Sequence, residues 1–260
     1  MNFLCIHERM ASLLVGFILI GGAAHKSCAQ ELKRLGDGKI LIDNFQEDTT
    51  GHLPAGWYDR DGDKQTVNFN ARERAKYHYK VMEEDGNKFL RYEGMEAMHL
   101  NFPLTNKQGK NIYNIDVYKT PVLSWKWRVF KLPHGGDVNN NSKNDAAASV
   151  YVVWGFGHVL FKKVPKSVRY VWGSSEPAGA TFSNFFGNQK IVVLKSGPTD
   201  EGKWITMHRN IVKDYKHLFG DNPPKAPLAI LILSDGDNTR SLVKADYDDI
   251  MLEPARSVDN

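Results

Sequence analysis

The sequence contains very little cysteine, since Cys5 and Cys28 are the only two among its 260 residues. Both precede Gln30, in a segment that we expect to be removed from the mature protein. The mature chain then has no thiol, which excludes a disulfide framework, a thiolate metal site and a cysteine nucleophile. Its stability must come from core packing, alone or with a bound cation.

Positive charge is not concentrated anywhere along the chain, and the formal net charge is only +4. Nucleic-acid-binding proteins usually gather lysine and arginine on one stripe, so we expect no nucleic-acid partner. Catalytic signatures are absent as well: the sequence has no Gly-x-Ser-x-Gly elbow, no His-Glu-x-x-His motif and no phosphate-binding loop. The histidines, His99 among them, are dispersed without ligand spacing, which favours structural or exposed positions.

Long hydrophobic runs are also missing, apart from one near the start at residues 11–24. This run follows Arg9 and is too short to span a bilayer comfortably. Ser27 and Ala29 then place small residues three and one before a cleavage point after Ala29. A charged residue, an apolar run and small residues, in that order, are typical of a secretory signal peptide.

We therefore predict a signal peptide at residues 1–29 and a single β-sandwich domain at residues 30–260. The mature protein is then periplasmic or secreted, with no integral membrane span. An uncleaved membrane anchor is the alternative interpretation of the same run.

Alternation of apolar and polar residues is clearest at Leu123–Val129. Trp125 and Trp127 share one face of the predicted strand, whereas Lys126 and Arg128 share the other. One buried face and one polar face are typical of antiparallel sheets.

Further strands are expected at fairly even spacing, together with a hairpin that turns at Asp85–Asn87. Ile211, Tyr215 and Leu218 fall at helical spacing, and Gly220 offers a C-terminal cap. This order predicts an all-β fold, an antiparallel β-sandwich of jelly-roll type with one late short helix. The other predicted strands are Ile40–Phe45, Phe89–Tyr92, Ser149–Trp154, Val168–Trp172, Lys190–Lys195, Trp204–Asn210 and Leu228–Leu233.

Cationic side chains on the strands are the first candidate ligand contacts. Lys126 and Arg128 leave the strand together, opposite the tryptophans, and could meet an acidic or hydroxyl-rich ligand if that face is concave. A solvated face that discourages edge pairing is the structural alternative. Arg169 is the third cation that we expect to contact ligand oxygens.

A glycine-rich, aromatic region extends from Trp154 to Phe186. We assign Trp154 and Trp172 to core packing, because aromatic residues that alternate along strands are usually buried. Phe182, Phe185 and Phe186 are expected in a loop, where flat rings could stack on a sugar or another flat ligand.

Acidic clusters follow or join the late strands, at Asp235–Thr239 and at Asp246–Asp249. Crowded carboxylates repel one another unless a cation or hydrogen-bond donors intervene. The first cluster fits a cation site or a plain turn whose Asp and Asn side chains bond their own backbone. If the protein is an enzyme, Asp145, Asp235 and Asp237 are the candidate acid and base residues.

The order of several motifs resembles an uncharacterised family of bacterial exported proteins, catalogued as domain of unknown function 3047. The motifs are Leu123–Val129, Asp145 ahead of Val150–Val153, Tyr170–Trp172, Lys190–Val193 with Ser196–Gly197, Trp204, Asp214–Tyr215 with Phe219–Gly220, and Asp235–Thr239. The resemblance covers roughly Asp43 to Leu252 and implies the fold and an exported location, but no mechanism.

A looser similarity is to jelly-roll carbohydrate-binding modules, carried by Asp43–Gln46 and Ala245–Ile250. In those modules the first and last strands meet, and their acids can hold a structural calcium ion. The resemblance therefore implies a structural calcium site at Asp43, Asp248 and Asp249, although Asn44 and Gln46 stand where acids are expected. No other cofactor is required.

Three functions remain open at this point. The first is an exported binding module for a glycan or cell-envelope polymer. The second is a hydrolase or lyase that acts on such a polymer. The third is a structural envelope protein that binds other proteins.

Overall fold

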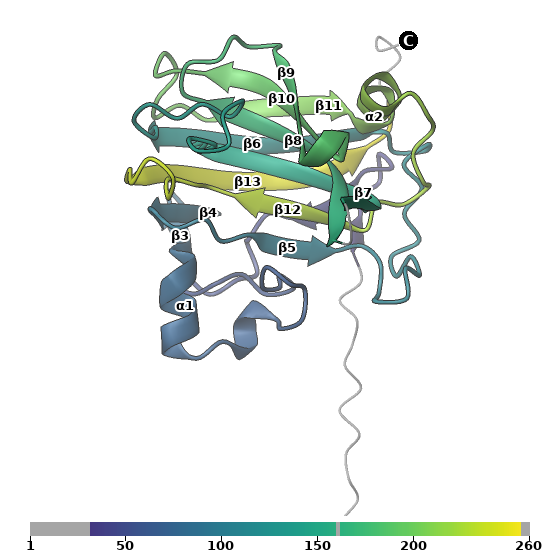
Figure 1. Cartoon of the computed structure of the whole chain (residues 1–260). Helices are drawn as coiled ribbons and strands as arrows, with labels where there is room; N and C mark the ends of the chain where they lie inside the picture. Colours follow the sequence, from purple (N-terminus) through teal and green to yellow (C-terminus); the bar gives the residue numbers. More distant parts are fainter. Residues whose placement is uncertain (1–31, 160–161, 256–260) are drawn as a thin grey trace, which may run out of the picture. The chain divides into compact units, whose positions relative to one another are not determined.

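A computed structural model describes residues 32–159 and 162–255 of the chain, and the predicted signal peptide lies outside them. Two sheets lie face to face within this part (Figure 1). The first sheet contains β1 (Lys33–Arg34), β2 (Ile40–Asp43), β3 (Tyr79–Glu84), β4 (Asn87–Gly94), β6 (Val122–Lys131), β11 (Ile205–Asn210) and β13 (Val243–Glu253). The second sheet contains, in spatial order, β5 (Leu100–Pro103), β12 (Ala229–Leu233), β7 (Ala148–Val159), β8 (Lys162–Gly173), β10 (Gln189–Ser196) and β9 (Thr181–Asn184).

The strand pairing is that of a jelly roll. From β4 to β13 the chain behaves as one long hairpin rolled across two sheets: β4 pairs with β13, β5 with β12, β6 with β11, and β7 with β8, all antiparallel. Such a roll places the two ends of the hairpin side by side. The first and last long strands also meet, because β13 pairs with β2. The predicted β-sandwich of jelly-roll type is confirmed.

The core between the sheets is rich in aromatic rings. Trp125 and Trp127 are fully buried on β6, while Lys126 and Arg128 leave from the outer face. The two indoles meet Tyr170 and Trp172 of the opposite sheet at ring-centroid distances of 5.6 and 6.0 Å. The period-two pattern therefore identified the buried face correctly, and the assignment of Trp154 and Trp172 to packing is also confirmed.

One pairing departs from the antiparallel rule. Strand β10 runs parallel to β8, and β9 lies beyond it, antiparallel to β10. The connection after β8 passes over one strand position to form the edge strand β9, and the chain then turns back into the gap as β10. The sequence pattern predicted this strand at Lys190–Lys195 but could not reveal its parallel pairing, because periodicity fixes a strand's faces and not its neighbours.

The late helix is present as α2, Ile211–Phe219, with Gly220 in the left-handed conformation at its C-terminus. A second helix, α1 (Ala71–Tyr77), was not predicted. It begins with a capping box, in which the side chain of Asn70 accepts from the backbone of Glu73 and the side chain of Glu73 accepts in return. Within residues 32–159 and 162–255, neither helix has the length and apolar character of a membrane span.

Candidate ligand-binding groove

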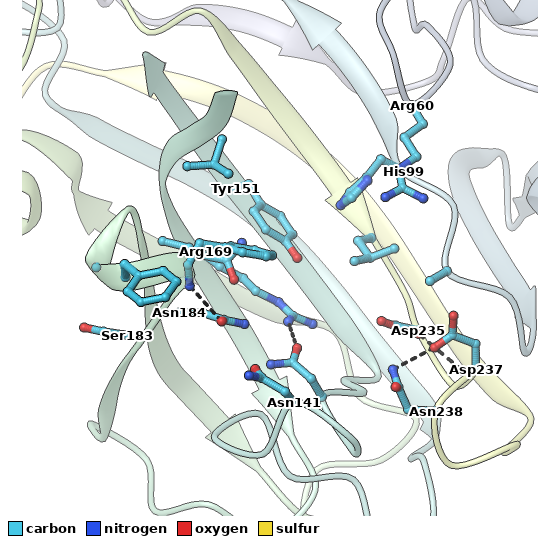
Figure 2. A pocket seen from close by; sticks show the side chains of 18 residues that line it. Arg60, His99, Asn141, Tyr151, Arg169, Ser183, Asn184, Asp235, Asp237 and Asn238 are labelled. Atoms are coloured by element: carbon cyan, nitrogen blue, oxygen red, sulfur yellow. Dashed lines mark hydrogen bonds between the residues drawn. The ribbon is translucent and has the colours of Figure 1, made fainter. Parts of the chain in front are cut away.

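The outer face of the second sheet carries a groove of about 1230 Å³ (Figure 2). Tyr151 on β7 and Arg169 on β8 are register partners, so both side chains leave the sheet on the same side. Their neighbours Val150, Val152 and Tyr170 point the opposite way, into the core. The alternation that builds the sandwich therefore also places Tyr151 and Arg169 in the groove.

Other parts of the chain complete the groove's walls. The segment before β5, the asparagine-rich loop before β7, the turn after β12 and the short η2 helix (Phe185–Gly187) all contribute. Besides Tyr151 and Arg169, the lining includes Arg60, Ala97, His99, Asn141, Asn144, Val164, Ser183, Asn184, Phe185, Phe186, Gly187, Gln189, Leu233, Asp235, Asp237 and Asn238.

Arg169 lies at the floor of the groove with only 2% of its surface exposed. Its Nε donates to the hydroxyl of Ser149 at 3.1 Å, and its Nη1 donates to the side-chain oxygen of Asn144 at 2.5 Å. Its Nη2 is buried and has no hydrogen-bond partner among the described residues. An unsatisfied buried donor costs about 1–3 kcal/mol, and more when the group is charged. This arginine is held in place with one donor nitrogen left for a ligand.

Tyr151 and His99 lie beside this arginine (Figure 2). Their rings meet edge to face with centroids 5.6 Å apart, and the guanidinium carbon of Arg169 is 5.4 Å from the Tyr151 ring. Burial lowers the pKa of His99 to about 4, and the positive charges of Arg60 and Arg169 act in the same direction. Burial also raises the pKa of Tyr151 to about 12. At neutral pH both rings are uncharged and can exchange hydrogen bonds with hydroxyl groups.

Two carboxylates, Asp235 and Asp237, line the groove, and a third, Asp145, is buried beside them. Asp145, Asp235 and Asp237 each offer an oxygen within 4.8 Å of the others. The jelly roll brings them together, because Asp235 closely follows β12, Asp145 closely precedes β7, and these strands are antiparallel neighbours. The three residues named as candidate acid and base are thus assembled by the fold.

The three carboxylates differ in their surroundings. Asp145 is fully buried and accepts from the backbone and side chains of Asn238 and Thr239, so it fixes the turn after β12. Burial raises the pKa of Asp235 to about 7, with a smaller opposing effect from Arg169 and further increases from Asp145 and Asp237. Asp237 is exposed. This geometry fits both roles suggested for Asp235–Thr239, a turn held by hydrogen bonds and a site for a cation or a proton.

The three predicted phenylalanines differ in position as well. Phe186 is 90% exposed and Phe185 is 48% exposed, and both line the groove. Phe182 lies on β9, not in a loop, and packs against a small cluster that contains Val138 and Ile191. The sequence correctly separated these rings from the main core, but the expectation of one continuous loop was wrong for Phe182.

Lys126 and Arg128 do not reach the groove. They lie on the outer face of the first sheet, where Lys126 pairs with Asp249 at 2.7 Å. Arg128 donates to Asp246 and Glu84 at 2.7–2.9 Å. The expectation that these two cations share a ligand with Arg169 is therefore wrong, because β6 and β8 belong to different sheets that face opposite directions.

The acids of the predicted calcium site have protein partners. Asp43 accepts from the indole of Trp57 at 2.7 Å, and Asp248 accepts from the side chain of Asn87 at 3.0 Å. Burial raises the pKa of Asp43 to about 7 and that of Asp248 to about 6. Across the described residues, the one trio spaced for a metal ion is Asp145, Asp235 and Asp237. A calcium site at Asp43, Asp248 and Asp249 stays a prediction, which a chelator-dependent melting temperature would test.

Comparison with known proteins gives a family and some distant structural likenesses. No curated protein matches the chain. The family 30 carbohydrate-binding module of a cellulosomal cellulase of Clostridium thermocellum is 11% identical, with a TM-score of 0.39, and the match covers 84% of this chain and 99% of that one. The family 11 module of another cellulosomal cellulase of Clostridium thermocellum is 13% identical, with a TM-score of 0.36 and coverages of 85% and 97%.

A third likeness is to a family 29 carbohydrate-binding module from Piromyces equi, which is 9% identical with a TM-score of 0.32 and coverages of 85% and 93%. The family match rests on the sequence itself. The model of the protein family of unknown function DUF3047 matches residues 55–251, which include every lining residue of the groove and the jelly-roll strands from β4 to β12, together with most of β13. The chain belongs to the DUF3047 family.

Proposed function

We propose that the protein is a glycan-binding module and that the groove over β7 and β8 is its binding site. The observation that carries the proposal is the composition of this groove, which combines accessible aromatic rings with hydrogen-bond donors and acceptors. Sugar rings present apolar C–H faces to aromatic rings and hydroxyl groups to donors and acceptors. Phe185 and Phe186 supply the exposed rings, and Tyr151, Asn144 and Arg169 supply the polar groups.

The dimensions and position of the groove favour a polymer over a single sugar. Its volume of about 1230 Å³ exceeds the range of about 300–1,000 Å³ typical of small-molecule pockets. It lies along the outer face of a sheet, with loops only at its edges, so an extended chain can enter and leave. In this proposal the protein acts outside the cytoplasm, on a glycan or another envelope polymer.

Binding is best tested by affinity electrophoresis in gels that contain soluble polysaccharides, followed by calorimetry on the polymers that retard the protein. We expect Phe186→Ala to weaken binding about 2- to 10-fold through the loss of aromatic contact. Tyr151→Phe should have an effect of similar size, because it removes one hydrogen-bonding hydroxyl and keeps the buried ring.

Phe156→Ala is the matched control, because Phe156 is 51% exposed and lies outside the groove's lining. Equal losses in Phe156→Ala and Phe186→Ala would show that the retardation comes from nonspecific hydrophobic contact. No retardation by any polysaccharide in a broad panel would contradict the proposed function.

Hydrolysis of the bound glycan is the second candidate function, and one observation favours it. Asp235 has a pKa of about 7, so it can hold a proton at neutral pH beside the carboxylate of Asp237. A carboxyl group that holds its proton near neutral pH, beside a second carboxyl group, is the arrangement that general acid catalysis requires. The test is the release of new reducing ends from a retarding polymer, which Asp235→Asn should abolish while binding is retained. Retention of full activity in that variant would exclude this role.

A further inference from the structure

We infer that the groove selects glycans that carry an oxyanion, a carboxylate or a sulfate, and that Arg169 is the residue that recognises it. This inference rests on the proposed function and specifies its ligand class. Its basis is the buried Nη2 of Arg169, which has no partner among the described residues while the other nitrogens of the same side chain are anchored.

The anchoring of Arg169 leaves it little freedom to find another partner. Ser149 and Asn144 hold Nε and Nη1 from two sides, and the Tyr151 ring lies beside the guanidinium carbon. The free nitrogen is therefore preorganised, so a ligand need not supply the cost of ordering the side chain. A bond between a guanidinium and an oxyanion is also stronger than one between two neutral groups.

A second cation faces the same part of the groove. Arg60 is exposed, lines the groove beside His99 and makes no side-chain hydrogen bond or ion pair within the described part of the chain (Figure 2). The charges of Arg60 and Arg169 both act on His99, which places the two guanidinium groups around one uncharged imidazole. This end of the groove attracts negative charge.

The carboxylates beside the groove do not form ion pairs with Arg60 or hydrogen bonds with Arg169 in the described part of the chain. The charge of Arg169 acts on Asp235, but no hydrogen bond joins the two side chains in residues 32–159 and 162–255, and Asp145 accepts from Asn238 and Thr239 instead. The groove thus has a basic end at Arg60 and Arg169 and an acidic end at Asp235 and Asp237. A glycan fits both ends if its oxyanion lies at the first and its hydroxyl groups lie at the second.

Calorimetry with matched polymers tests the inference. The probes are polygalacturonate, its carboxyl-reduced neutral form, dextran sulfate and neutral dextran. We expect at least one acidic polymer to bind and its neutral counterpart to bind about 10- to 100-fold more weakly. Preference for polygalacturonate assigns the oxyanion as a carboxylate, and preference for dextran sulfate assigns it as a sulfate.

Two variants test which arginines select the acidic polymer, and a third variant serves as the control. Arg169→Gln should remove the preference for the acidic polymer, and Arg60→Gln should weaken acidic binding about 2- to 5-fold, as expected for an exposed ion pair. Arg72→Gln changes an exposed arginine on α1, outside the groove, and should change nothing. Because Arg60 is exposed, its variant remains informative even if Arg169→Gln fails to fold.

The outcomes separate the inference from the proposed function. Equal affinity for an acidic polymer and its neutral form, or an unchanged preference in folded Arg169→Gln, overturns the inference but leaves glycan binding intact. Equal losses in Arg72→Gln and Arg60→Gln also overturn it, because they indicate general charge attraction. Binding to neutral glycans alone overturns the inference, whereas binding to no glycan overturns the proposed function itself.

Discussion

Both outer faces of the sandwich carry arginines on central strands, but their surroundings differ. On the first sheet, Arg91 and Arg128 flank Asp246 across β4, β13 and β6, and both donate to its fully buried carboxylate at 2.7–2.9 Å. Glu84 accepts from both as well. On the second sheet, Arg169 has neutral partners and one nitrogen without any within the described chain.

This difference separates an arginine that stabilises the fold, Arg128, from an arginine that is available to a ligand, Arg169. Arg128 also stacks against Trp204 and Phe130, with its guanidinium carbon 4.5 and 4.8 Å from the ring centroids, so its interactions are completed within the protein. Arg169 is just as firmly positioned, but its interactions are incomplete. An arginine of the first kind should affect stability, whereas one of the second kind should affect binding.

The largest expected effect comes from breaking the network on the first sheet. Asp246→Asn leaves the guanidinium groups of Arg91 and Arg128 without their shared buried counter-charge. Removing one partner from a buried ion pair costs about 3–5 kcal/mol. Urea denaturation should show a loss of this size. A loss below about 1 kcal/mol would show that this network is not structural.

A smaller loss of stability is expected from Arg128→Gln. Asp246 keeps its bonds to Arg91 in this variant, so the cost should be about 1–3 kcal/mol, as for a hydrogen bond to a charged group. Its affinity for the glycan should equal that of the wild type. A folded Arg128→Gln protein with weakened glycan binding would instead place the ligand on the first sheet.

Asp235 in the groove should make the stability of the domain depend on pH. The pKa of Asp235 is about 7 in the fold and about 3.9 for an unperturbed aspartate, so the fold favours its protonated form. The domain therefore loses stability as the pH rises from about 4 to 7. Asp235→Asn should remove part of this loss and raise the melting temperature at pH 8 by about 2–4 °C.

Asp61→Asn provides the comparison for that measurement, since Asp61 is exposed and lies outside the groove's lining. The advantage of Asp235→Asn should shrink steadily as the pH is lowered toward 4. An advantage that is the same at pH 5 and pH 8 would mean that Asp235 is ionised normally in the fold.

The smallest effect on stability is expected from Arg169→Gln. This variant loses bonds to neutral partners but also removes an unsatisfied buried donor, and these two changes oppose each other. The free energy of unfolding should change by less than about 1 kcal/mol. Denaturation of this variant beside Arg128→Gln tests the contrast directly, and a larger loss for Arg169→Gln would reverse our assignment of the two arginines.

Much of the fold followed from local patterns. The strict alternation around Trp125 identified the inward face of β6, and the helical spacing that ends at Gly220 identified α2. Two short strands escaped prediction, because β5 and β9 have only four residues each, too few for alternation to stand out from the surrounding sequence. Helix α1 was missed although Asn70 and Glu73 have the spacing of a capping box.

The site was harder to predict because it depends on which strands become neighbours. Arg169 and the three aspartates were chosen by residue type, and nothing local in the sequence links them to Tyr151, His99 or Arg60. These residues meet because β12, β7 and β8 are adjacent and β5 brings its preceding segment to the same face. Lys126 and Arg128 were expected to contact the same ligand as Arg169, but they lie on the other sheet. Alternation predicts the outer face of a strand but not the sheet to which the strand belongs.

A crystal structure of the protein with an oligosaccharide cut from the best-binding polymer tests the central claim most directly. Our account predicts that the sugar rings lie over β7 and β8, with a ring against Phe185 or Phe186 and a ligand oxygen within hydrogen-bonding distance of Arg169 Nη2. A ligand bound to the outer face of the first sheet, beside Lys126 and Arg128, would contradict it.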